Sequence, residues 1–234
     1  MNDAKNIEAV AEVVLELYSQ LDEMSARELA ASDITPTCKK GCSLCCYEHV
    51  DIFGIEAAPI VAAVNKMPPE QRSRLASRVN EYVAAREGTD ALDVLSDPNE
   101  AEALYSKNIT RKERRAADRK ILKRSIRHRK LAWRTSTPCP FLEDGACSIY
   151  EARPFSCRAM FSQVKPVEAV YKSGKSPIVR FDGVRFASAL LQMAKEAGKE
   201  AHSLTLPHGP LVGVLLSLVG PDAFKDTKNP EASD

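Results

Sequence analysis

The chain has 234 residues, of which 44% are hydrophobic and 28% are charged. This mixture is typical of a folded globular protein and excludes a wholly disordered chain. The formal net charge of +1 excludes a surface built throughout for nucleic acid or anionic lipid. The early residues are rich in acidic side chains, and the longest apolar run, 211–219, is about half of what a bilayer span needs. We therefore expect a cytoplasmic protein with no membrane partner, formed by one domain over residues 1–220 and a polar tail at 221–234.

The first expected element is an amphipathic helix of about 25 residues. Its apolar residues recur at steps of three and four, which places them on one stripe: Ile7, Val10, Val14, Leu17, Leu21 and Met24. We expect this stripe to pack on the core of the protein. A self-associating coiled coil is the alternative.

Two shorter helices follow the first cysteine-rich segment. Residues 54–64 predict a helix that is interrupted near Pro59 or begins after it. Pro68-Pro69 opens the next helix, and residues 87–90 end it. Its apolar face is expected to contain Leu75, Val79, Tyr82 and Val83.

A basic helical insert is expected at about 111–134. Eleven Lys and Arg residues between positions 111 and 130 face only Glu113 and Asp118, a local net charge of 11 − 2 = +9. One interpretation is a docking surface for nucleic acid or an acidic protein, represented by Arg114, Arg115, Arg124 and Arg127. The other is a solvated helix whose apolar residues rest on the body of the protein.

A short β-hairpin is expected near 139–150, because Asp144-Gly145 is a strong turn signal between apolar runs. Regular pairing about this turn would place Cys139 and Cys147 on opposite faces. Either the flanking prolines distort the strand, or the two thiols have different partners. Two further helices are expected at 183–199 and 211–219, so the fold class is mainly α: a helical bundle around a cysteine-rich metal site.

Seven cysteines form two blocks, and none lies outside them: Cys38, Cys42, Cys45 and Cys46, then Cys139, Cys147 and Cys157. An odd number in a reducing cytosol argues against a disulfide framework. Thiolates select zinc, copper(I) or iron–sulfur clusters. Seven thiols are too many for one zinc ion, so one [4Fe–4S] cluster with spare thiols, two metal ions or a site with bridging sulfurs remain open.

The cysteine blocks also resemble a known family. The spacing Cys38-x3-Cys42-x2-Cys45-Cys46, followed by Cys-Pro-Phe-Leu, Gly-x-Cys-Ser-Ile-Tyr-Glu-x-Arg-Pro and Cys-Arg, is similar to that of the YkgJ-type CxxCxxCC proteins. These proteins are often bacterial and are described as zinc- or iron-chelating. The resemblance implies that all seven cysteines are metal ligands, with Arg153, Pro154 and Arg158 framing the site.

Three functions follow as hypotheses. The first is a metal-binding protein that holds zinc or an iron–sulfur centre in a structural or redox role. The second is an iron–sulfur enzyme that modifies protein, since one branch of the family is similar to flagellin lysine methylases and Cys-x3-Cys-x2-Cys is also the spacing of radical S-adenosylmethionine enzymes. The third is a metal-stabilised adaptor that binds nucleic acid or an acidic partner through residues 111–130.

No catalytic residue can be assigned from the sequence. His49 is a candidate ligand or acid/base group, although a surface histidine is the simpler expectation. Glu48, Asp51 and Glu56 are candidates for an open coordination position, and a role at the start of a helix is the alternative for Glu56.

Overall fold

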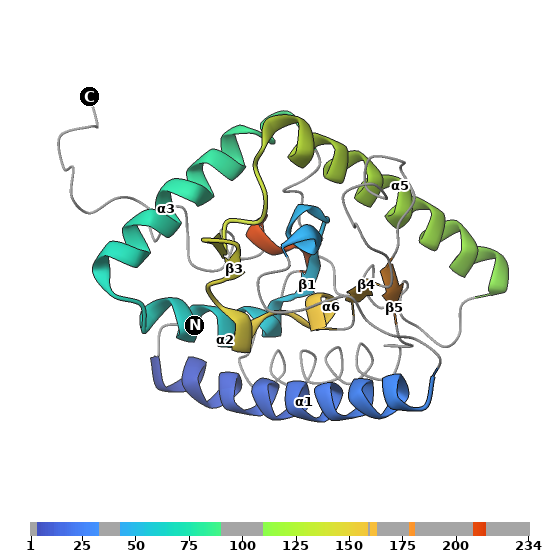
Figure 1. Cartoon of the computed structure of the whole chain (residues 1–234), viewed down its shortest axis with the longest axis horizontal. Helices are drawn as coiled ribbons and strands as arrows, with labels where there is room; N and C mark the ends of the chain where they lie inside the picture. The colour runs from blue at the N-terminus through green and yellow to red at the C-terminus, as the bar shows by residue number, and fades with distance from the viewer. Residues whose placement is uncertain are drawn as a thin grey trace.

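The computed structural model describes residues 4–32, 43–89, 110–158, 160–162, 178–180 and 208–213. The α-helices are α1 (Ala4–Ala30), α2 (Ala57–Asn65), α3 (Pro69–Ala84), α5 (Arg111–Thr135) and α6 (Phe155–Arg158). Short 3₁₀ helices lie at η1 (Leu44–Tyr47), η2 (Gly54–Glu56) and η4 (Tyr150–Ala152). Figure 1 shows α1, α3 and α5 on the outside, around a centre formed by short strands and turns.

Three antiparallel strand pairs are described. They are β1 (Asp51–Phe53) with β6 (His208–Pro210), β2 (Leu142–Glu143) with β3 (Ala146–Cys147), and β4 (Met160–Ser162) with β5 (Ile178–Arg180). The β2–β3 pair is the hairpin expected near 139–150, so the prediction of a mainly α fold with a short hairpin is confirmed.

The hairpin turn has the geometry that its two residues predict. Asp144 and Gly145 both have positive φ, 49° and 77°, which a two-residue hairpin loop requires. Leu142 then pairs with Cys147. Glu143 accepts hydrogen bonds from Arg74 and Gln71 of α3, at 2.7 and 3.1 Å, and these bonds fix the hairpin against that helix.

The prediction for the helix around Pro59 is wrong in one respect. The α2 helix begins at Ala57 and contains Pro59 in its first turn without a break. The first four backbone N–H groups of a helix have no intrahelical partner, so a proline there removes no hydrogen bond.

The buried face of α1 includes only part of the predicted apolar stripe. Val14 and Leu21 are buried as predicted, and Ala11, Tyr18 and Ser25 are buried beside them. Ile7, Val10, Leu17 and Met24 are only half-buried. Tyr18 is drawn into the buried face because its hydroxyl donates to Glu56 across the contact between α1 and η2.

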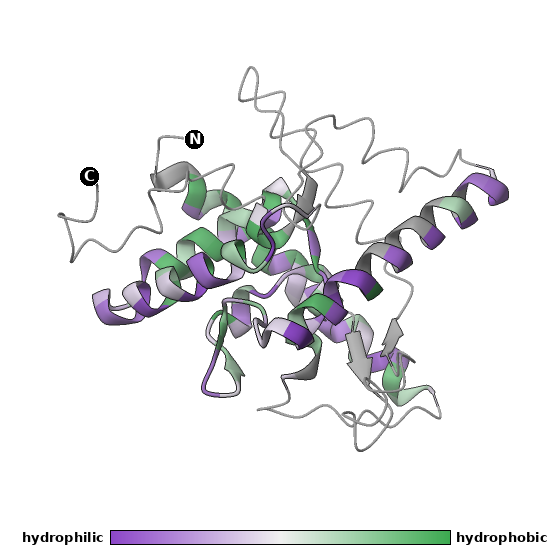
Figure 2. Ribbon diagram, turned by 90° about the horizontal axis from the view of Figure 1, so that it is seen from above, coloured by the Kyte–Doolittle hydropathy of each residue, from purple (hydrophilic) through white to green (hydrophobic). Residues whose placement is uncertain are grey.

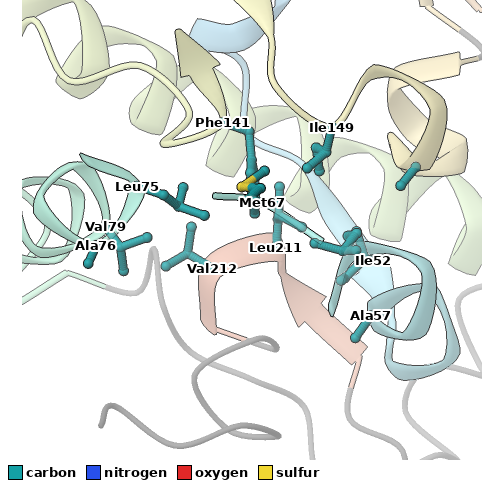
Figure 3. Packing of buried hydrophobic residues seen from close by; sticks show 12 residues of the cluster. Ile52, Ala57, Met67, Leu75, Ala76, Val79, Phe141, Ile149, Leu211 and Val212 are labelled. Carbon is teal, nitrogen blue, oxygen red and sulfur yellow. The ribbon is translucent and has the colours of Figure 1, made fainter. Parts of the chain in front are cut away.

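The hydrophobic core joins segments that are far apart in the sequence. Leu75 and Val79 of α3 pack with Ile52 of β1 and with Phe141 and Ile149 from the second cysteine block, as Figure 3 shows. Leu211 and Val212 complete the cluster, and residues 211–213 are helical. The rest of the helix expected at 211–219, the helix expected at 183–199 and the tail at 221–234 lie outside the described residues.

None of the described helices combines the length and the apolar character that a membrane span requires.

A buried carboxylate ties three parts of the fold together. Glu56 accepts hydrogen bonds from the hydroxyl of Tyr18 at 2.6 Å, from the amide of Phe53 at 3.0 Å and from the amide of Phe155 at 2.8 Å. Burial raises the pKa of Glu56, and this effect outweighs the three hydrogen bonds that lower it. The bond to Phe53 is the helix-start role that was the alternative for this residue.

We expect Glu56→Gln to destabilise the protein by about 3 kcal/mol, because the amide NH₂ would face a buried donor and leave it unsatisfied. The free energy of unfolding in urea measures the change, and Glu12→Gln on the exposed side of α1 is the matched control. A loss for Glu56→Gln no larger than that of the control would contradict this role.

Candidate metal centre

The two cysteine blocks meet through their backbones. The amide of Cys139 donates to the carbonyl oxygen of Cys46 at 2.7 Å, although 93 positions separate the two residues in the sequence. The structure therefore brings Cys46 of the first block together with Cys139 of the second.

Five cysteines are described at this junction, and all are free, half-buried thiols. Cys45 and Cys46 lie on η1, Cys139 precedes the hairpin, Cys147 is on β3 and Cys157 is on α6. We call these five residues the thiol cluster. Cys45 interacts electrostatically with each of the other four, and Cys157 also interacts with Cys139 and Cys147. Cys38 and Cys42 lie outside the described residues.

Cys139 and Cys147 do not lie on opposite faces of a regular hairpin, because the β2 strand is too short to include Cys139. β2 contains only Leu142 and Glu143, so Cys139 lies before the ladder and not within it. Its amide pairs with Cys46 instead, and its thiol interacts with that of Cys147. The chain around Pro138 and Pro140 has left the regular strand, which is one of the two outcomes that the sequence allowed.

Backbone amides favour the thiolate form at three members of the cluster, Cys45, Cys139 and Cys147. The amides of Phe141 and Ile149 donate to the sulfurs of Cys139 and Cys147, in each case from two residues further along the chain. Burial nevertheless raises the pKa of Cys139 to about 12 and also raises that of Cys147. Amide donors of this kind stabilise a sulfur that carries negative charge.

The adjacent cysteines on η1, Cys45 and Cys46, form a hydrogen bond with each other. The Cys46 thiol donates to the sulfur of Cys45, which lowers the pKa of Cys45 to about 7, and the same bond raises the pKa of Cys46. Burial raises the pKa of Cys157 well above its ordinary value. Cys45 is therefore the thiol of the cluster that ionises most readily.

Three arginines supply positive charge around the cluster. Arg153 favours the thiolates of Cys45 and Cys147, and Arg158 acts on Cys147 as well. Arg158 is buried, donates to the carbonyl oxygens of Arg153 and Glu151, and forms an ion pair with Asp22 of α1. The two arginines expected to frame the site therefore lie beside it, and one of them also joins it to α1.

Pro154 shapes the turn that presents the last cysteine. Its carbonyl oxygen accepts the amides of Cys157 and Arg158, at 2.9 and 3.1 Å, and its own ring is buried. These bonds form the single turn of α6.

The third arginine, Arg86, does not belong to either cysteine motif of the sequence. It follows α3, is 3% exposed, and its guanidinium donates to the hydroxyl and the carbonyl oxygen of Thr137 at 3.2 and 3.1 Å. It also lies 3.4 Å from the centre of the Tyr82 ring and favours the thiolate of Cys139. Sequence reasoning missed it because Thr137, its partner, is 51 positions away.

The residues that directly follow Cys46 hold the C-terminal half of α5. Glu48 and Arg129 form an ion pair at 3.0 Å, with side chains 4% and 5% exposed. The rings of Tyr47 and Trp133 stack with their centres 4.1 Å apart. The first cysteine block and the basic helix are thus joined by two side-chain pairs that the sequence did not indicate.

The expectation of a surface histidine at position 49 is wrong. His49 is 7% exposed, its Nε2 lies 3.0 Å from Asp51 Oδ1, and its ring packs 4.9 Å from that of His128 on α5. It is buried because α5 covers this segment. Glu48, Asp51 and Glu56, the candidates for an open coordination position, have Arg129, His49 and the three donors around Glu56 as partners.

The four arginines predicted to form the basic surface lie on α5. Arg115 and Arg127 are exposed. Arg114 and Arg124 belong to the same helix, but their side chains fall outside the described ones.

Within the described ranges, no set of three or more His, Cys, Asp or Glu side chains is arranged to hold a metal ion. The thiols of the two blocks converge, but the ligand set that the sequence predicts includes Cys38 and Cys42, which are not among the described residues. The assignment of all seven cysteines as ligands therefore stays a prediction.

Comparison with known proteins gives one match. The family model described as "CxxCxxCC: Putative zinc- or iron-chelating domain" matches residues 37–173. This range contains all seven cysteines. No curated protein and no solved structure matches the chain.

We expect either single change Glu48→Met or Arg129→Met to cost about 3 kcal/mol of stability, because each leaves a buried group without its ionic partner. The double change Glu48→Met with Arg129→Met should cost clearly less than the sum of the single changes. Urea unfolding of the four proteins measures this coupling. Additive losses would show that the two side chains do not act as a pair.

Proposed function

The chain belongs to the CxxCxxCC family of zinc- or iron-chelating domains, and we propose that it binds such a metal through cysteines of both blocks. The observation that carries the proposal is the convergence of five free thiols from two segments 93 positions apart. Cys38 and Cys42 would supply the remaining sulfurs from the same motif.

The chemistry of the donor set fits a thiophilic metal. The side chains that converge are thiols, which zinc and iron–sulfur clusters accept readily and hard cations do not. Three sulfurs already accept backbone amides, and Arg86, Arg153 and Arg158 offset negative charge. Such outer partners stabilise and orient the ligands of a metal centre.

The role that we propose for the metal is structural, in which it fastens the second cysteine block to the first. A metal held by both blocks closes a loop of about 90 residues, which on chain entropy alone favours the folded state by roughly 4–5 kcal/mol. A bound metal also supplies Lewis acidity or, in an iron–sulfur cluster, a place for an electron. Free thiols and a thiolate-bound metal both suit a reducing compartment, so we place the protein in the cytoplasm.

A second candidate function is that of an adaptor, in which the metal-stabilised body presents α5 to a negatively charged partner. The observation that favours it is the exposure of basic side chains along this helix, including Arg115 and Arg127. The ion pair between Glu48 and Arg129 anchors the helix to the body.

We expect the freshly purified full chain, prepared without oxygen, to contain stoichiometric zinc or iron. Elemental analysis and acid-labile sulfide measure it. Zinc without sulfide agrees with the structural role, and iron with sulfide would instead indicate a cluster capable of redox chemistry.

Cys157→Ser and Cys139→Ser should lower the metal content by removing a ligand, whereas Ser77→Ala, on the exposed side of α3, should not. Fresh wild-type protein without either metal would contradict the proposal.

Arg86→Gln is expected to weaken metal binding by about 10- to 100-fold, which is the usual effect of losing a partner of a ligand. Competition with a chromophoric chelator measures the affinity. Arg86→Lys should recover part of the loss because it keeps the charge, and Arg72→Gln on the exposed side of α3 is the control. Unchanged affinity in Arg86→Gln would show that this arginine serves packing alone.

A further inference from the structure

Seven exposed basic residues of α5 lie on one face of the helix. At 3.6 residues per turn, they fall within an arc of about 120° and extend over ~33 Å of the helix. The exposed cations on this arc, which we call the cationic face, are Lys112, Arg115, Arg119, Lys123, Arg127, Lys130 and Arg134.

The cationic face contains no acidic residue. Glu113 and Asp118 are the acidic residues of α5, and by the same helical spacing both lie outside the arc. Arg129, which pairs with Glu48, lies outside it as well. Within the described part of the chain, none of Lys112, Arg115, Arg119, Lys123, Lys130 and Arg134 is in an ion pair. These six cations are therefore not paired with an acidic residue of α5.

The helix is also presented to solvent as a rod. Its C-terminal half is fixed to the body through His128, Arg129 and Ala132, which are buried. Its N-terminal half extends beyond the other described helices, as Figure 2 shows. At its start, Thr110 and Glu113 form a capping box that stabilises this exposed end.

We propose that the cationic face binds the phosphate backbone of double-stranded DNA, with α5 lying in the major groove. This names the partner of the adaptor role proposed above. A face with cations along its whole length and no acidic residue is complementary to a partner with regularly spaced negative charges. Duplex DNA carries one negative charge per about 1.7 Å of its axis. Four of the seven cations are arginines, the side chain whose planar fork matches phosphate.

The dimensions favour DNA over duplex RNA. An α-helix with its side chains is about 10–12 Å wide, and the major groove of B-DNA, about 12 Å wide, admits it. The major groove of duplex RNA is too narrow and deep for side chains to enter. Beside the cations, the arc contains only Ala116, Ile126 and Trp133. It therefore has no Asn or Gln to read adenine, and we assign its arginines and lysines to the phosphates.

The test is filter binding of the full chain to a 24-base-pair DNA duplex of mixed sequence, at a series of salt concentrations. Each cation that neutralises a phosphate contributes about −0.9 to the slope of log K against log salt. The triple variant Arg115→Gln, Arg119→Gln, Lys123→Gln should bind more weakly and flatten this slope by up to about 2.7. Gln has nearly the helix propensity of Arg and Lys, so α5 should be kept, as circular dichroism will show.

A matched control removes the same charge elsewhere. Arg27→Gln, Lys66→Gln, Arg72→Gln changes three exposed cations on or next to α1, α2 and α3, and it should leave the affinity and the slope unchanged. Equal weakening in the control would overturn the proposal, since net charge alone would then explain the binding. Absence of salt-sensitive binding by the wild type would overturn it too.

Two competitors separate the other partners. Duplex RNA of the same sequence and polyglutamate, a mimic of an acidic protein, should compete less well than the DNA. Stronger competition by either would overturn the assignment to DNA. The metal content of each variant is measured on the same samples, so that a failure of the metal proposal is distinguished from a failure of this one.

Discussion

The buried carboxylate of Glu56 is the group that holds α1, β1 and α6 together. Its oxygens accept donors from α1, from the end of β1 and from the start of α6. Since α6 contains Cys157 and β1 follows the first cysteine block, the position of one thiol relative to the others depends on this group. A buried carboxylate is costly unless donors surround it, so these contacts must form together.

The thiol cluster has its own electrostatic balance. Burial opposes ionisation of Cys139 and Cys157, while amides and arginines favour the charged form of several sulfurs. Arg158 contacts both the Glu56 network and the thiol cluster. Its guanidinium lies 4.5 Å from the ring of Tyr18, which donates to Glu56, and its charge also lowers the pKa of Cys147. Arg158 thus joins the second block to α1 and also favours the thiolate form of a cysteine in the cluster.

The features that could be predicted from the sequence are those that depend on neighbouring residues. Apolar spacing predicted α1 and α3, Asp144-Gly145 predicted the hairpin, and motif spacing predicted that the cysteine blocks lie together. The sequence could not predict Arg86 with Thr137 or Glu48 with Arg129, because such pairs depend on which segments meet in three dimensions. His49 was misjudged for the same reason: nothing near it in the sequence reveals that α5 covers it.

The stacked pair Tyr47 and Trp133 has a practical consequence. Trp133 is the only tryptophan of the chain, and its ring lies against the residue that directly follows Cys46. Tryptophan emission responds to the surroundings of the indole. The protein therefore contains its one tryptophan at the junction between its first cysteine block and its basic helix, and the tryptophan emission of the unlabelled chain is a single-site signal from that junction.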